Sequence, residues 1–151
     1  MRIAVATDHG GFILKSAVID AVIKSGNEVV DLGVDNGDGS VDFPDYAEKA
    51  ARVLQQNLAD RAVLICGSGV GMCIAANKFK GVNAAVCHDT YSAHQGVEHD
   101  GMNTLCLGGR IVGTELTSEI VKAFLSASFI HDPRFERRVG KIKSFEQQEE
   151  K

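Results

Sequence analysis

One stretch near the middle of the chain decides the fold: Arg61-Ala62-Val63-Leu64-Ile65-Cys66-Gly67-Ser68-Gly69-Val70-Gly71. Residues 62–66 are apolar at consecutive positions, which is typical of a strand covered on both faces. A glycine-rich turn follows, and it opens a helix that ends near Lys78. A buried strand that leads through a short turn into a helix is the building unit of α/β proteins.

The same unit recurs toward both ends of the chain. Strands are predicted at 3–7, 28–32, 61–66, 83–87 and 104–107, and helices at about 12–25, 43–56, 71–78, 90–98, 114–127 and from 133 onward. Gly26 is the predicted stop of the first helix, and Asp89 or Thr90, Thr114 and Asp132 are predicted caps. This alternation predicts a single Rossmann-like α/β domain over residues 1–151. We expect a three-layer sandwich with a five-stranded parallel sheet, helices on both faces and an extra C-terminal helix.

The last predicted helix has an apolar stripe whose destination is open from pattern alone. Its members recur at helical spacing and are Phe135, Val139, Ile142 and Phe145. Such a stripe has to be covered. It packs either on its own domain or on a partner subunit.

Composition narrows the possible partners and the compartment. The formal net charge of −4 over 151 residues argues against a general surface for nucleic acid or anionic membrane. No apolar stretch approaches the roughly 20 residues that span a bilayer, and the N-terminus begins a strand at once rather than a signal segment. The four cysteines have no CxxC spacing. We therefore expect reduced thiols in a cytosolic protein.

A parallel sheet binds ligands outside the carboxyl ends of its strands. Four segments should therefore converge there: Asp8-His9, Cys66 with its glycine turn, Cys87-His88-Asp89, and Gly108-Gly109-Arg110. The backbone N–H groups of a glycine turn that opens a helix can hold a phosphate or a developing oxyanion. Cys66 beside them is either an activated thiol or a small buried side chain that closes the strand. The turn lacks both the GxGxxG order of a dinucleotide site and the Gly-Lys-Ser/Thr of a P-loop.

Each of the remaining polar candidates could instead have a purely structural or solvent-exposed role. Asp8 and His9 either contact a ligand or cap the next helix and face solvent. His88 and His94 are interpreted as surface or satisfied histidines, whereas His99, at a predicted helix end, is a candidate for the active site. His94 and His99 are five residues apart and do not share a helical face, which argues against a zinc site.

Three arginines lie at the start of the last helix. Arg134 and Arg138 are four apart and project from one face, with Arg137 beside them. Two guanidinium groups make a good phosphate clamp. A solvated charged face is the alternative interpretation.

Taken together, these segments resemble the type B ribose-5-phosphate isomerases, a family that includes galactose-6-phosphate and allose-6-phosphate isomerases. The resemblance covers nearly the whole chain in order. The matching pieces are Asp8-His9-Gly10-Gly11-Phe12, Cys66-Gly67-Ser68-Gly69-Val70-Gly71, Ile74-Ala75-Ala76-Asn77-Lys78, Tyr91-Ser92-Ala93, His99-Asp100-Gly101-Met102-Asn103 and Leu107-Gly108-Gly109-Arg110-Ile111-Val112-Gly113.

The resemblance implies a role for each matching residue. Cys66 would remove the proton beside the carbonyl, Ser68 would help to move protons, and His99 would open the sugar ring. Amides of the turn would hold the enediolate. The implied substrate contacts are Asp8, His9, Gly67, Ser68, Gly69, Val70, Gly71, Asp100, Asn103, Arg110, Arg134 and Arg138. Sites shared between subunits would require a homodimer or a dimer of dimers, and no metal or organic cofactor is implied.

The implied reaction is an aldose–ketose isomerisation of a sugar phosphate. Ribose 5-phosphate, a substrate of the pentose phosphate pathway, is the first candidate, and erythrulose, allose and galactose phosphates are the others. Asp100 departs from the asparagine common in the family, which puts the identity of the sugar in question. A non-catalytic sugar-phosphate-binding subunit and a nucleotide-binding flavodoxin-like module are the competing hypotheses.

Overall fold

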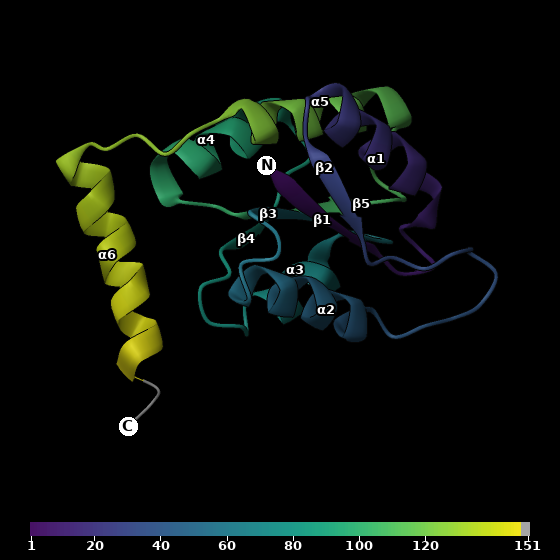
Figure 1. Cartoon of the computed structure of the whole chain (residues 1–151), viewed down its shortest axis with the longest axis horizontal. Coiled ribbons are helices and arrows are strands. Elements are labelled where there is room, and N and C mark those ends of the chain that lie inside the picture. The colour runs from purple at the N-terminus through teal and green to yellow at the C-terminus, as the bar shows by residue number, and fades with distance from the viewer. Residues whose placement is uncertain (149–151) are drawn as a thin grey trace.

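The protein, described here over residues 1–148 by a computed structural model, is an α/β sandwich with an additional helix at its C-terminal end (Figure 1). Its sheet contains five strands, all parallel: β1 (Arg2–Thr7), β2 (Glu28–Asp31), β3 (Arg61–Cys66), β4 (Ala84–Val86) and β5 (Thr104–Gly108). They lie in the order β2-β1-β3-β5-β4. The predicted fold class is confirmed.

Helices cover both faces of the sheet (Figure 1). On one face lie α1 (Lys15–Lys24), which follows a 3-10 turn η1 (Phe12–Leu14), α4 (Thr90–Asp100) and α5 (Thr114–Ser126). On the other lie α2 (Phe43–Gln55) and α3 (Val70–Ala76). The last helix, α6 (Pro133–Gln148), stands at one side of the sandwich.

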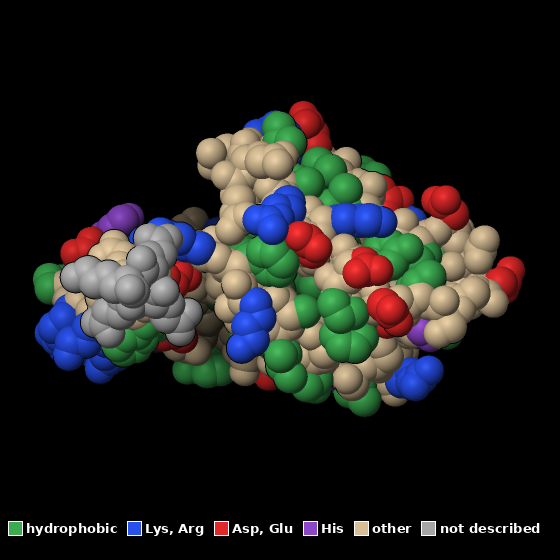
Figure 2. Space-filling model, turned by 90° about the horizontal axis from the view of Figure 1, so that it is seen from below, with side chains coloured by type: hydrophobic (Ala, Val, Ile, Leu, Met, Phe, Trp, Pro, Cys, Tyr) green, Lys and Arg blue, Asp and Glu red, His purple; other side chains and the backbone are tan. Residues whose placement is uncertain are grey.

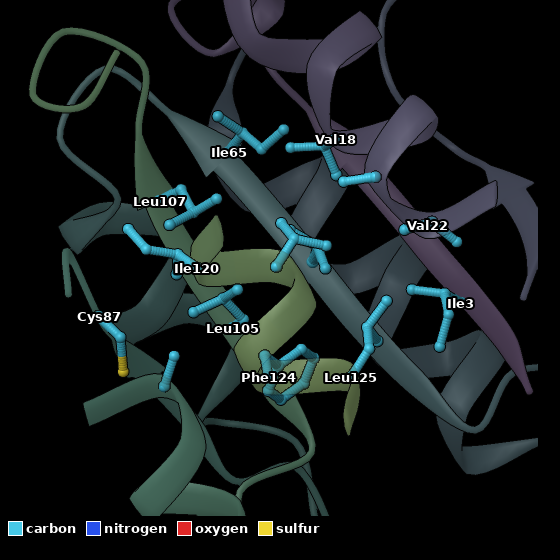
Figure 3. Packing of buried hydrophobic residues seen from close by; sticks show 14 of the residues in the cluster. Ile3, Val18, Val22, Ile65, Cys87, Leu105, Leu107, Ile120, Phe124 and Leu125 are labelled. Carbon is cyan, nitrogen blue, oxygen red and sulfur yellow. The ribbon is translucent and has the colours of Figure 1, made fainter. Parts of the chain in front are cut away.

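The central strands bury both faces, as their uninterrupted apolar sequence predicts. Larger side chains point toward α1, α4 and α5, where the residues Ile3, Val5, Val63, Ile65, Leu105 and Leu107 pack on Val18, Ile120 and Phe124 (Figure 3). Smaller ones point the other way and meet the alanines of α2, namely Ala47, Ala50 and Ala51. Alanine-rich packing lets α2 approach the sheet closely. Cys66 and Cys106 both belong to this second face.

Local signals set most helix ends where they were expected. Gly26 has a φ of +76° and ends α1, and the carboxylate of Asp89 accepts the Ser92 N–H at 2.6 Å at the start of α4. The prediction that Thr114 caps α5 is wrong, because Thr114 is already the first helical residue and Gly113 precedes it without a side-chain cap. Helix α4 extends two residues beyond its predicted end at Glu98, to Asp100, and is followed by Gly101, whose φ is +67°.

Helix α6 divides the predicted apolar stripe. Phe135 and Val139 are buried, whereas Ile142 and Phe145 are exposed. Glu146 accepts the Gly81 N–H at 3.0 Å and so holds the far end of α6 near the loop before β4. Lys and Arg side chains gather on the end of the molecule that α6 forms, at the left of Figure 2. The first half of the stripe therefore packs on its own domain, and the second half remains on the surface.

The strand order reverses at the carboxyl end of β3, which makes this end a topological switch point. The neighbours of β3 are β1 and β5, and the chain leaves both toward the α1 and α5 face. From β3 it leaves toward the α2 and α3 face. Loops that depart to opposite faces leave a space between them, which is where open α/β sheets bind ligands. Within residues 1–148, no helix combines the length and the apolar character needed to cross a bilayer.

Candidate active site

Cys66 ends β3 with its side chain folded back over the glycine loop, residues 67–71. Its Sγ accepts the backbone N–H of Gly69 at 3.1 Å, and only 5% of the residue is exposed. Gly69 makes this possible because its φ is +81°, a conformation that L side chains rarely adopt. A Cβ at Gly69 would also lie 2.9 Å from the backbone carbon of Leu107. The thiol of Cys66 thus lies within hydrogen-bonding distance of a backbone donor, as an anionic sulfur would require.

The glycine loop has amide donors that the protein itself does not use. Ser68 Oγ accepts the Val70 N–H at 3.3 Å, which accounts for one of them. Among the residues that the structure describes, no hydrogen bond uses the N–H of Gly67 or Ser68. Backbone donors left unpaired beside a thiol suit an oxyanion that forms during a reaction.

Two side chains flank the glycine loop. The guanidinium of Arg110 lies over Gly67, where its Cζ would be 3.4 Å from an added Cβ. At the other end the ring of Phe43 covers Gly71, with its nearest carbon 2.8 Å from an added Cβ. A side chain at Gly71 would therefore displace the Phe43 ring, whereas a Cβ at Gly67 would only touch the Arg110 guanidinium. Arg110 was predicted here from the sequence, but Phe43 was not.

Phe43 could not be found by looking at strand ends, because it begins α2 and comes from the opposite side of the glycine loop. Only its exposure marks it: 38% of an aromatic side chain lies open at a helix start. Phe43 thus places an exposed aromatic ring against Gly71, at the end of the glycine loop.

Asp8 and His9 follow the end of β1, next to the carboxyl end of β3. Asp8 Oδ1 accepts the Gly11 N–H at 2.9 Å, so this buried carboxylate caps the turn that follows it. Capping was the alternative to ligand contact in the sequence analysis. His9 Nδ1 accepts the Val41 N–H at 3.2 Å. Because a backbone N–H can only donate, the neutral His9 ring carries its proton on Nε2. That N–H is a donor for a hydroxyl or a phosphate.

Close backbone contact brings this loop to Cys66. A Cβ on Gly11 would lie 2.2 Å from the carbonyl oxygen of Ile65, and one on Gly10 would lie 3.0 Å from the Gly67 nitrogen. Glycine is therefore required at Gly11 for steric reasons alone. Cys66, the glycine loop, Asp8, His9 and Arg110 together form what we term the Cys66 half-site.

His99 lies in the last turn of α4 with its ring orientation fixed from two sides. The ring stacks on Phe135 of α6, with centroids 4.1 Å apart and planes 16° from parallel. The amide nitrogen of Gln95 lies 2.9 Å from His99 Nδ1. An amide NH₂ donates, so the neutral His99 ring carries its proton on Nε2. In this tautomer His99 presents its Nε2–H as a hydrogen-bond donor.

Arg134 of α6 lies against Phe135, the residue on which His99 stacks. The Arg134 guanidinium forms two hydrogen bonds of 3.0 Å with the carboxylate of Asp132 and stacks 5.4 Å above the Phe135 ring. The hydrogen bonds from Arg134 lower the pKa of the Asp132 carboxyl. We term His99, Asp100, Arg134 and Arg138 the His99 half-site.

Asn103 was predicted to contact the substrate, and its side chain also has partners within the protein. Its amide oxygen accepts the Asn83 N–H at 2.9 Å and the Thr104 hydroxyl at 3.1 Å, and its nitrogen donates to the Gly81 carbonyl at 2.8 Å. These bonds hold the loop before β4 against the start of β5. The role of Asn103 in substrate binding stays a prediction. The two histidines interpreted as satisfied do have partners, Gly108 N–H for His88 and Glu98 for His94.

The two half-sites lie at opposite ends of the strands: the Cys66 half-site at the carboxyl ends and the His99 half-site at the amino ends. Gly108 pairs with Cys66 at the carboxyl edge, whereas Thr104, at the start of β5, follows Asp100 by only four residues. The rise from Thr104 to Gly108 alone separates the edges by roughly 13 Å. The hollow beside His99, of about 680 Å³, is lined by α4 and α5 and not by the glycine loop. Within one chain, His99 and Cys66 therefore do not meet.

Comparison with known proteins decides the family. The family model described as Ribose/Galactose Isomerase matches residues 3–142. The chain belongs to this family. It is 41% identical to ribose-5-phosphate isomerase B of Escherichia coli over 146 residues, 97% of each chain. It is 37% identical to the D-erythrulose-4-phosphate isomerase of Pectobacterium atrosepticum over 129 residues, 85% of each chain.

Solved structures of the family agree with this assignment. Ribose-5-phosphate isomerase B of Clostridium thermocellum superimposes with a TM-score of 0.93 at 42% identity, covering 99% of both chains. The Mycoplasma genitalium enzyme, solved with bound ribulose 5-phosphate, gives a TM-score of 0.90 at 39% identity over 97% of both chains. As a member of the ribose/galactose isomerase family, the protein is a sugar-phosphate isomerase.

The cysteines of this isomerase are free thiols, as expected. Within residues 1–148, no three side chains of His, Cys, Asp or Glu come together to hold a metal ion. A hydrogen bond from the buried Cys106 lowers the pKa of Cys73 to about 7, while burial raises the pKa of Cys87 to about 11. Cys73 lies on α3, just beyond the glycine loop.

We predict that iodoacetamide alkylates Cys73 but not Cys87 at pH 8. Only thiolate reacts. Because the pKa of Cys73 is about 7, its alkylation rate should rise between pH 6 and pH 8, whereas Cys87, with a pKa of about 11, stays protonated. Peptide mass spectrometry after timed labelling measures both rates, with Cys73→Ser as the control. An unlabelled Cys73 in the native protein at pH 8 would refute the assignment.

Proposed function

We propose that the protein interconverts ribose 5-phosphate and ribulose 5-phosphate through a cis-enediolate, with Cys66 as the base. One observation carries the proposal: Cys66 Sγ lies within a hydrogen bond of the Gly69 N–H, beside the unpaired amides of Gly67 and Ser68. A hydrogen next to a carbonyl is a weak acid, so a base can remove it only if the resulting oxyanion is stabilised close by. Both requirements are met within residues 66–69.

The proton transfers follow from this arrangement. The Cys66 thiolate takes the proton from C2 of the open-chain aldose, and the electron pair moves to O1 as the enediolate forms. Amides of the glycine loop bind the charged oxygen. The thiol then returns its proton to C1, while Ser68 Oγ helps to move the hydroxyl proton from O2 to O1. No atom is gained or lost, and the ketose is the product.

We further propose that each site is completed by a second copy of the chain. His99 would donate a proton to the ring oxygen as the bond from C1 to that oxygen breaks, while the C1 hydroxyl gives up its proton to solvent and becomes the aldehyde. This step requires contact with the same molecule that Cys66 deprotonates. The two residues lie at opposite sheet edges of one chain. A homodimer, or a dimer of dimers, would bring the His99 half-site of one copy against the Cys66 half-site of the other.

The same pairing gives the phosphate its contacts. Arg134 stacks on Phe135 beside His99, and Arg138 lies four residues further along α6, so both would arrive from the partner copy. His9 and Arg110 would contribute from the Cys66 half-site. Binding the distant phosphate positions the reacting carbons against Cys66. We place the protein in the cytosol, in keeping with its four free thiols.

Asp100 is the residue that bears on the choice of sugar. It ends α4 next to His99 and accepts a 3.4 Å hydrogen bond from Gln95. A carboxylate there accepts hydrogen bonds from sugar hydroxyls and repels an enediolate oxygen. The family includes an enzyme named for erythrulose 4-phosphate. Measured kcat/KM values decide whether the substrate has four, five or six carbons.

A panel of erythrulose, ribose, allose and galactose phosphates tests the substrate, and we expect ribose 5-phosphate to give the highest kcat/KM. In D₂O the product should carry deuterium at the carbon that Cys66 reprotonates. Product formation and label are read by NMR, with Cys66→Ala as the blank. A higher kcat/KM on another sugar phosphate would reassign the substrate and leave the proton transfer intact.

A further inference from the structure

His88 lies two residues beyond the end of β4 and is half-buried. Its Nε2 accepts the backbone N–H of Gly108 at 3.0 Å. Because that N–H can only donate, Nε2 is unprotonated and the neutral ring carries its proton on Nδ1. The bond connects the edge strand to the end of β5, directly beside Cys66.

The imidazole takes the place of a missing strand carbonyl. The ladder between β4 and β5 ends where the Cys87 N–H donates to the Cys106 carbonyl at 3.3 Å. In a parallel sheet, alternate residues of a strand bond to the same neighbour. The next N–H of β5 on that side belongs to Gly108, and β4 has already ended. His88 supplies the acceptor instead.

The turn that begins at Gly108 holds the Cys66 loop. The Gly109 N–H donates to the Cys66 carbonyl at 2.8 Å, and the Arg110 N–H donates to the Gly67 carbonyl at 3.0 Å. A Cβ on Gly108 would lie 2.8 Å from the Ser68 carbonyl oxygen. The two backbones pack against each other with no side chain between them, so a shift of one moves the other.

We propose that His88 is a positioning residue that fixes the 108–110 turn and, through it, the amides beside Cys66. Its effect on turnover rests on the proposed function, whereas its mechanical effect does not. Without the imidazole acceptor, the Gly108 N–H faces the end of the sheet unpaired, and the turn relaxes toward water. The amide donors of the glycine loop and the guanidinium of Arg110 then move out of their positions relative to Cys66.

Amide hydrogen exchange tests the mechanical part without any substrate. His88→Asn keeps an amide group but is too short to place its oxygen at Nε2, whereas His88→Gln reaches that position. In His88→Asn, peptides covering 66–71 and 108–111 should exchange at least about tenfold faster than in the native protein. In His88→Gln they should exchange at nearly the native rate. Unchanged exchange in His88→Asn would overturn the proposal.

Kinetics test the catalytic part. We expect His88→Asn to lower kcat at least about tenfold with a smaller change in KM, because the displaced amides bind the enediolate more than the substrate. His88→Gln should recover kcat to within about threefold. A merely structural role predicts equal losses in both variants, so the absence of recovery by Gln counts against the proposal.

Asn77→Ala is the matched control. The Asn77 side chain holds the other end of β4 through two 2.8 Å hydrogen bonds with the backbone of Ala84. Its loss should lower the melting temperature and leave exchange at 66–71 unchanged. If the native protein turns over no sugar phosphate, the proposed function fails, and the exchange result still decides the role of His88.

Discussion

Replacing Cys66 with alanine should lower kcat by a factor of about 10⁴ or more, since removing a base that acts directly on the reacting atom leaves only binding and oxyanion stabilisation. The substitution removes one sulfur that contacts the Gly69 N–H and leaves the backbone of the glycine loop in place. Binding of the sugar phosphate should therefore persist. Steady-state kinetics and isothermal titration with ribose 5-phosphate measure the two effects separately.

Cys73→Ser is the control for loss of a thiol near the site. Cys73 lies on α3 and hydrogen-bonds with Asn77 and the Ala84 carbonyl, away from the glycine loop amides. Its replacement should leave kcat within about twofold of the native value. Near-native turnover by Cys66→Ala would remove Cys66 from the role of base.

Mixing two inactive variants should restore activity. A chain with Cys66→Ala and a chain with His99→Ala each lack one half-site, and His99→Ala alone should lower kcat at least about 100-fold because it removes a general acid. In a hybrid dimer with shared sites, one site has both residues and the other has neither. Random mixing in equal amounts makes half the dimers hybrid, so about a quarter of the native activity should return.

The reverse mixture is the control. A chain carrying both substitutions, mixed with the native chain, forms hybrid dimers in which neither site is complete. Activity per native chain should fall by about half after equal mixing. If Cys66 and His99 acted within one chain, that activity would not change and the first mixture would stay inactive. Native mass spectrometry confirms that hybrids have formed.

The elements of the fold could be predicted because their signals are local. Consecutive apolar residues marked β3, Gly26 marked the end of α1, and Asp89 marked the start of α4. The Cys66 half-site shares this property in part, because Cys66 and the glycine loop are contiguous in the chain. A strand, a turn and a helix start depend on neighbours a few residues away, and the sequence displays those directly.

Other features depend on which strands lie side by side. The order β2-β1-β3-β5-β4 places β5 next to β3 although β4 lies between them in the chain. From that order follow the contact of the 108–110 turn with Cys66 and the imidazole of His88 at Gly108. The ring of Phe43, at the start of α2, contacts Gly71 in α3. The side chain of Asn103 forms hydrogen bonds with the loop before β4, which is distant in the sequence. None of these has a local signature.

The amino-acid sequence alone made Cys66 and the glycine loop candidates for the site, because the sulfur and the amide donors come from adjacent residues, and the reaction class came from the family resemblance. Only the tertiary structure decided that His99 and the α6 arginines lie at the opposite edge of the sheet from Cys66. The physical reason is that a helix following a parallel strand must return along it. A residue at the end of α4 is therefore carried the full height of the sheet away from the strand ends, however close the numbers stand in the chain.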